Sequence, residues 1–276
     1  MPLLTWFRSI SGEDPTRTSE VPAKELRHRR PGCLSAGLLI LMLCTSVHAD
    51  EPVHAPSGDS ARVLETFDAY SNQVGEFPNT WGAQSGWRRA KEEDIYYALE
   101  SEDGNIFLRA QTTGKAVNAA TGANVNLRIY NRFRWRWRAF SLPVGGNEED
   151  KKLSDSGAAV RLVFHGGIIP KMLTYVWSAT LPAGTETVSP NTDKVKIIVL
   201  ESGSSKLGEW VWEEVDAYGD YKRLYGGEPR LVKYVAVITD SDNTNTFVMA
   251  DYDDFSFVKA PPDTLEMVPD FLETQP

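Results

Sequence analysis

Four arginines alternate with apolar residues between positions 131 and 140. In a strand, alternate side chains point to opposite faces, so one face would carry Arg132, Arg134, Arg136 and Arg138 and the other Phe133, Trp135 and Trp137. A guanidinium binds a carboxylate or sulfate through two parallel hydrogen bonds, so such a row could hold an acidic ligand. The alternative is structural, with acids on neighbouring strands neutralising the row; the candidates are Glu209, Glu213, Asp216 and Asp155.

Aromatic residues near this segment could add stacking platforms for sugar rings. The ligand-binding residues that we predict are Arg134, Trp135, Arg136, Trp137, Asp155, Arg161, Tyr175 and Trp177. Each aromatic residue also has a core interpretation. For Trp135 and Trp137 burial is favoured, because a strand that alternates Arg with Trp most naturally buries its Trp face.

No complete catalytic motif is present, so we name no catalytic residue. His165, followed by Gly166 and Gly167, is the single histidine of the predicted folded region. A lyase acting on uronic acid polymers would need cations for the substrate carboxylate and a Tyr or His base. Arg161, Tyr175 and His165 could meet that need, so a polysaccharide lyase or a glycoside hydrolase stays open as the enzymatic alternative.

An acidic loop could bind calcium. Asp240, Asp242 and Thr244 alternate, and Asp251 is the twelfth position from the first Asp, which approaches the ligand spacing of an EF-hand loop. A hairpin turn in which Asp and Asn cap their own backbone explains the same residues. A rival site combines Asp251, Asp253 and Asp254 with Asp68. Calcium is therefore the single cofactor considered.

The first 49 residues have the composition of a secretory signal. A basic stretch at 27–30 precedes an apolar run at 34–47 that is too short to span a membrane. Cleavage after Ala49 would leave a periplasmic or secreted protein with no stable membrane span. Both cysteines, Cys33 and Cys44, lie in the signal, so the mature protein would contain no disulfide.

The predicted mature protein is acidic. Of 29 basic and 38 acidic side chains, 6 and 4 lie in residues 1–49, which leaves 23 against 34. This balance argues against nucleic acid and an anionic membrane surface as partners, because both are bound mainly by Lys and Arg that neutralise phosphates.

The elements that must position these residues are mostly strands. Alternating or apolar runs separated by turn residues predict strands at 62–67, 96–99, 106–111, 126–140, 158–164, 172–178, 195–201, 210–215, 234–239 and 247–258. One short helix is expected at 218–225, closed by Gly226. We expect a flexible lead-in at 50–61, one mainly β domain at 62–259 forming a two-sheet, jelly-roll-like sandwich, and a tail at 260–276.

Six segments, in order, resemble a bacterial exported family known as domain of unknown function 3047. They are Trp135-Arg136-Trp137, Asp155 with Arg161, Tyr175-Val176-Trp177, Gly208-Glu209-Trp210, Asp220-Tyr221 and Thr239-Asp240-Ser241-Asp242-Asn243-Thr244. The resemblance covers nearly the whole mature domain and implies no particular activity. Asn245 stands where the family pattern suggests a glycine. The ends of the domain, 65–68 and 253–257, are similar to those of carbohydrate-binding jelly rolls.

The sequence favours an exported, non-catalytic protein that binds a glycan or a related envelope polymer. A lyase-like enzyme acting on acidic glycans is the first alternative, and a structural or protein-interaction role in the cell envelope is the second. Ligand identity and oligomeric state are left open.

Overall fold

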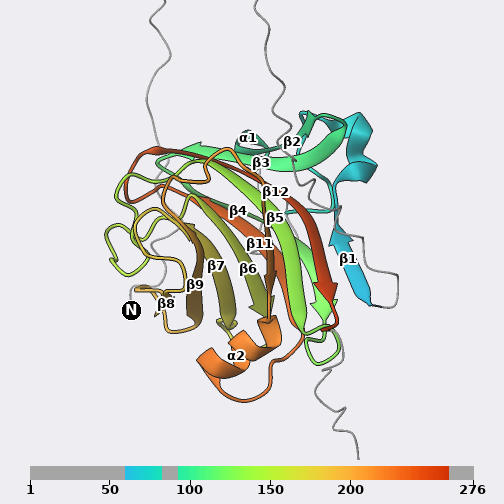
Figure 1. Ribbon diagram of the computed structural model, residues 1–276, viewed down its shortest axis with the longest axis vertical. Coiled ribbons are helices and arrows are strands. Elements are labelled where there is room, and N and C mark those ends of the chain that lie inside the picture. Colours follow the sequence, from blue (N-terminus) through green and yellow to red (C-terminus); the bar gives the residue numbers. More distant parts are fainter. Residues whose placement is uncertain (1–59, 83–92, 261–276) are drawn as a thin grey trace, which may run out of the picture. The chain divides into compact units, whose positions relative to one another are not determined.

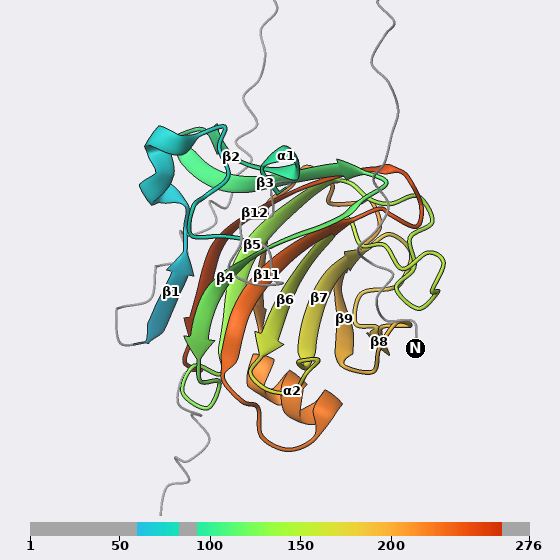
Figure 2. The same ribbon diagram turned by 180° about the vertical axis from the view of Figure 1, so that it is seen from behind.

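The computed structural model describes residues 60–82 and 93–260, which belong to one compact unit. The predicted signal, most of the lead-in and most of the tail lie outside these residues. No helix in the described ranges is long and apolar enough to cross a membrane. Two sheets form a sandwich (Figures 1 and 2), which confirms the predicted mainly β class.

The first sheet, called sheet A, is antiparallel throughout. Its strands run in the order β10 (Val211–Val215), β5 (Arg132–Ser141), β12 (Phe247–Val258), β3 (Asn105–Thr113) and β2 (Tyr97–Glu102). A further strand, β1 (Ala61–Glu65), pairs with β12 over residues 255–258. The central position of β5 and β12 places the alternating arginines opposite the acidic residues of β12.

The second sheet, called sheet B, faces the first across the core. Its order is β4 (Ala116–Val125), β11 (Val232–Asp240), β6 (Ala158–Phe164), β7 (Met172–Ser178), β9 (Val195–Ser202) and β8 (Glu186–Val188). The pair β7 and β9 is parallel, and the others are antiparallel. Neither β4 nor β8 was predicted, because the small and polar residues of β4 lack a clear alternation and β8 is only three residues long.

The predicted helix is present as α2 (Ala217–Tyr225), and two shorter turns are η2 (Asp68–Gln73) and α1 (Glu93–Tyr96). Asp216 caps α2 by accepting a hydrogen bond from the Gly219 amide. At the other end Gly226 has a φ of 67°, a conformation that glycine adopts without steric cost. Figure 2 shows α2 across the ends of β6 and β7, and the Tyr225 hydroxyl lies 2.6 Å from the Met172 carbonyl oxygen.

Aromatic side chains from β5 and β7 fill the space between the sheets. Trp135 packs on Tyr175 with ring centroids 5.5 Å apart, and Trp137 packs on Trp177 at 6.0 Å. All four side chains are fully buried. Aromatic residues of this size each bury about 150–250 Å² and dominate core energetics, so this core is a main source of stability for the described residues, none of which is a cysteine.

Candidate functional site

The four aromatic residues predicted as stacking platforms belong to this core. Three of them donate a hydrogen bond inside the protein: Trp137 Nε1 to Glu213, Tyr175 Oη to Asp220 and Trp177 Nε1 to Gly203. The buried Nε1 of Trp135 has no partner within the described residues. A buried ring offers no face to a sugar. Burial, the favoured interpretation of Trp135 and Trp137, is therefore confirmed, and the predicted ligand-binding role of all four residues, Tyr175 and Trp177 included, is corrected to a packing role.

The three residues named for a possible lyase do not converge. Tyr175 points into the core, and burial beside Asp220 raises its pKa well above the ordinary value, which disfavours a base role. Arg161 is level with Thr174, one residue from Tyr175 on β7, and so lies on the opposite side of sheet B. His165 follows β6 and contacts Asn124 Oδ1 through Nε2 at 3.2 Å.

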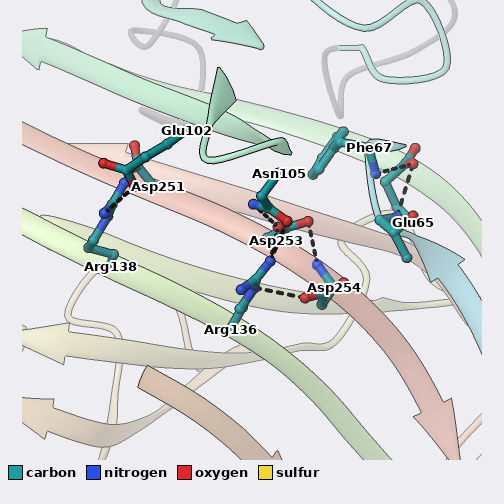
Figure 3. A network of polar contacts seen from close by, with 10 residues as sticks. Glu65, Phe67, Glu102, Asn105, Arg136, Arg138, Asp251, Asp253 and Asp254 are labelled. Carbon is teal, nitrogen blue, oxygen red and sulfur yellow. Dashed lines mark hydrogen bonds and ion pairs between the residues drawn. The ribbon is translucent and has the colours of Figure 1, made fainter. Parts of the chain in front are cut away.

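The outer face of sheet A, the side away from the core, carries a network of arginines and acids (Figure 3). Asp251 accepts hydrogen bonds from Arg109 Nε at 2.7 Å and from Arg138 Nη2 at 2.8 Å. Arg138 also donates through Nη1 to Glu102 at 2.7 Å. The Asp251 side chain is completely buried, so two guanidiniums enclose its charge.

A second part of the same network is centred on Asp253, which is also completely buried. Arg136 Nη2 donates to Asp253 Oδ2 at 2.6 Å, and Asn105 Nδ2 donates to the same oxygen at 2.9 Å. Arg136 Nε lies 2.7 Å from Asp254 Oδ2. Burial raises the pKa of Asp253, while Asn105 and Arg136 oppose that change.

These contacts change two predictions. Asp251 and Asp253 were proposed as calcium ligands, but their oxygens are held by guanidinium groups, and a cation would have to displace them. The neutralising acids also differ from those expected, because they come from strands distant in sequence. They are Glu102, Glu214, Asp251, Asp253 and Asp254. The structural interpretation of the arginine row is thus confirmed for three of the four arginines, with other partners.

Aromatic rings lie against the outer arginines. The Arg138 guanidinium is 4.7 Å from the centroid of Trp210 and 4.8 Å from that of Phe140. Arg136 is 4.8 Å from Trp210. Such contacts favour one placement of the planar groups through cation–π attraction, so aromatic rings and acids together surround the guanidiniums of Arg136 and Arg138.

Arg134 differs from its three neighbours in β5. Among the described residues no hydrogen bond or ion pair is formed by Arg134, whose guanidinium lies 4.4 Å from the Trp212 ring centroid. Glu214 is level with Arg134 in the strand register but pairs with Arg132 at 2.6 Å. Trp212 is 45% exposed. We call Arg134 and Trp212 the Arg134–Trp212 patch, an accessible indole next to an unpaired cation.

Sequence reasoning missed Trp212. The strand at 210–215 was predicted, and alternation along it places Trp212 and Glu214 on the same face. This alternation could have identified Trp212 as an outward residue from the sequence. It could not show that β10 pairs with β5 and brings Trp212 beside Arg134.

The acidic loop between β11 and β12 forms a separate cluster of carboxylates. Carboxylate oxygens of Asp155, Asp240 and Asp242 all lie within 4.8 Å of one another. Asp155 is buried and accepts hydrogen bonds from the amides of Asn243 and Thr244. Burial, followed by repulsion from Asp242, raises the pKa of Asp240 to about 8. Three carboxylates are hard oxygen donors of the type that suits calcium, although Asp155, and not Asp251, is the third member.

Asn245 completes the turn after this cluster. Its φ of 54° lies in the left-handed region, where Asn is one of the few residues other than glycine that is well tolerated. Asn245 therefore adopts a left-handed turn that a glycine would also allow.

The family described as "Protein of unknown function (DUF3047)" matches residues 80–256. The chain belongs to this family. The match spans every strand of the sandwich except β1 and the last residues of β12. No curated protein sequence matches this member of the family.

Solved structures with a similar arrangement include carbohydrate-binding proteins. The family 11 carbohydrate-binding module of a Clostridium thermocellum cellulase has 11% identity and a TM-score of 0.40, covering 74% of this chain and 97% of its own. The CBM27-1 module of Caldicellulosiruptor saccharolyticus, in complex with mannohexaose, has 12% identity and a TM-score of 0.38, covering 73% and 98%. A family 12 xyloglucanase from Bacillus licheniformis has 11% identity and a TM-score of 0.36, covering 67% and 92%. Similarity this low does not bear on function.

Proposed function

We propose that this DUF3047 protein is an exported module that binds an acidic glycan or a related anionic envelope polymer through the Arg134–Trp212 patch. One observation carries the proposal: Arg134 forms no hydrogen bond or ion pair among the described residues and lies 4.4 Å from an indole ring that is 45% exposed.

The two side chains of the patch offer complementary contacts to a sugar acid. An exposed indole can pack against the apolar face of a sugar ring, and a guanidinium can bind its carboxylate or sulfate bidentately. Arg136 is 5.6 Å from the same Trp212 ring and is held by Asp253. The patch therefore borders a fixed surface, so little side-chain freedom remains to be lost on binding.

The net negative charge of the predicted mature protein limits where an acidic glycan can bind. Because the predicted mature chain has more acidic than basic side chains, a polyanion is repelled by most of its surface. We expect binding to depend on a few local contacts, and a neutral glycan of the same backbone to bind more weakly than the acidic one.

The test is isothermal titration calorimetry with oligogalacturonate and with its fully methyl-esterified, uncharged counterpart. We expect Trp212→Ala and Arg134→Gln each to weaken oligogalacturonate binding by about 5- to 30-fold, the equivalent of roughly 1–2 kcal/mol. The control is Phe247→Ala. Phe247 is 49% exposed on the same strand as Asp253 but roughly 20 Å along it, and its removal should leave affinity unchanged.

The outcomes separate the three functions considered. Binding that is lost in both variants and kept in the control supports the proposal. Growth of ultraviolet absorbance from unsaturated uronic products during the titration would replace it with a lyase. Equal binding by all variants, or no binding of acidic glycans, would contradict the patch and favour a structural or protein-interaction role.

A further inference from the structure

Arg161 lies near the middle of sheet B, on the face away from the core. Its neighbours in sequence, Val160 and Leu162, point into the core cluster, and alternation along β6 turns Arg161 outward. On one side β11 places Ala236 level with it, and on the other side β7 places Thr174 level with it. Two more strands flank these, so the cation is surrounded by sheet.

The residues beside Arg161 do not neutralise it. In the next strands of the sheet, Ala120 on β4 is level with Ala236 and Ile197 on β9 is level with Thr174. No acidic residue is therefore level with Arg161 on any of these strands. Within the described residues Arg161 forms no ion pair, and its hydrogen bond runs from Nε to Thr174 Oγ1 at 2.8 Å. Asp240, on β11, is four residues beyond Ala236, roughly 13 Å along the strand.

The two terminal nitrogens of Arg161 are free to bind a ligand. They donate no hydrogen bond within the described residues, and neither is among the fully buried polar atoms that lack a partner. Thr174 is buried and fixes the Nε edge of the guanidinium. The remaining edge, with its paired N–H groups, has the geometry that binds a carboxylate or sulfate bidentately.

The surroundings make this cation unusually receptive to an anion. Loss of hydration lowers the pKa of Arg161 to about 10, a change that Asp240 only partly opposes. A poorly hydrated charge without a partner is costly, and an incoming anion would offset that cost.

A recess lies next to Arg161 on the same face. Val163 and Tyr234, the next outward positions on β6 and β11 and roughly 7 Å away, line it together with Lys233, Gly167, Ile168 and Pro170. Its volume is about 210 Å³, below the usual range of roughly 300–1,000 Å³ for small-molecule sites. It has room for a single sugar unit, with the Tyr234 ring as one wall.

We infer that Arg161 and Thr174 form an anion-binding site for the carboxylate or sulfate of one acidic sugar unit, with the sugar ring in the recess beside Tyr234. The site is on sheet B and shares no residue with the Arg134–Trp212 patch. This second site therefore goes beyond the proposed function, and either site can be disproved without the other.

The experiment measures galacturonate binding by nuclear magnetic resonance, following the Nε–H signals of the arginine side chains in the intact protein. The signal of Arg161 should shift in a saturable manner with galacturonate and not with galactose, its neutral counterpart. Acetate serves as a second probe: saturation at a lower concentration of galacturonate than of acetate supports a sugar acid in the recess, whereas equal or tighter acetate binding overturns the sugar assignment and leaves a small-anion site.

Substitutions of Arg161 and Thr174 test whether these two residues form the anion-binding site. Arg161→Gln should abolish the saturable shifts around the recess, and Thr174→Val should weaken galacturonate binding by about fivefold, as expected for one hydrogen bond. Arg128→Gln, which changes a 59% exposed arginine that pairs with Glu228, should leave this site unchanged. Without ligand, Arg161→Gln should melt at the same temperature as the wild type or higher, because no ion pair is lost.

Three results would overturn the inference: an Arg161 signal that does not respond to saturating galacturonate, an Arg161→Gln variant that binds as well as the wild type, or a large loss of melting temperature in that variant. The last would show that the arginine has a structural partner. If Arg134→Gln loses oligogalacturonate binding while the Arg161 signal is silent, the proposed function stands and this inference fails.

Discussion

Replacement of Asp251 by Ala tests the conclusion that this carboxylate neutralises arginines. Asp251 accepts four hydrogen bonds, two from Arg109 at 2.7 and 2.9 Å and two from Arg138 at 3.0 and 2.8 Å. Charge-assisted bonds contribute about 1.5–3 kcal/mol each, but their sum overstates the loss. Arg109 is 27% exposed and can be rehydrated, and Arg138 keeps Glu102.

The cost should therefore be that of breaking a buried ion pair, about 3–5 kcal/mol. For a domain of this size 1 kcal/mol corresponds to about 2–4 °C, so we expect a decrease in melting temperature of about 6–20 °C. Urea denaturation followed by tryptophan fluorescence gives the free energy of unfolding. The control is Asp193→Asn, because Asp193 is 78% exposed and its change should stay within about 0.5 kcal/mol.

A double variant tests whether the unpaired Arg138 cation causes the loss of stability. Adding Arg138→Met to Asp251→Ala removes the buried cation that the first change leaves unpaired, so part of the lost stability should return. A loss below about 1 kcal/mol for Asp251→Ala would refute the ion-pair account. Loss of a calcium-dependent stabilisation in Asp251→Ala would instead restore its predicted role as a metal ligand.

Three further predictions concern pH, the core and calcium. Burial raises the pKa of Glu213 to about 7, so the folded state binds its proton more tightly than the unfolded state, and stability should fall as pH rises from about 4.5 through 7. Because Glu213 is half-buried, we expect Glu213→Gln to remove roughly 1–2 kcal/mol of the difference between pH 5 and pH 8.5; identical pH profiles of the two proteins would contradict this. Trp137→Ala should lower the free energy of unfolding by about 3–5 kcal/mol, whereas Trp212→Ala should lower it by less than 1 kcal/mol, and the reverse order in denaturation would show that the two residues have been misplaced. Calcium should raise the melting temperature of the wild type but not of Asp240→Asn, since a cation relieves repulsion within the Asp155, Asp240 and Asp242 cluster; a wild type that does not respond to calcium argues for a plain turn.

Much of the fold was predictable because strand patterns are local. The alternation at 131–140 correctly predicted β5 and the burial of Trp135 and Trp137, although the strand was expected from residue 126 and begins at Arg132. Gly226 correctly marked the end of α2. The small residues of β4 gave no such signal, since Ala and Gly do not distinguish a buried face from an exposed one.

The candidate site was less predictable, because side chains that meet across a sheet are distant in sequence. Tyr175 and Trp177 were expected on a ligand face, but whether an aromatic face of a strand is buried depends on the second sheet, which local pattern does not place. The sequence by itself determined the mainly β class, the alternating arginine row and the acidic loop. Only the tertiary structure decided which acids the arginines meet: Arg136 and Arg138 pair with acids of β12 and Arg132 pairs with Glu214 of β10, while Arg134 and Arg161 form no ion pair within the described residues. The physical reason is that ion pairing depends on distances of a few ångströms, and strand register sets those distances.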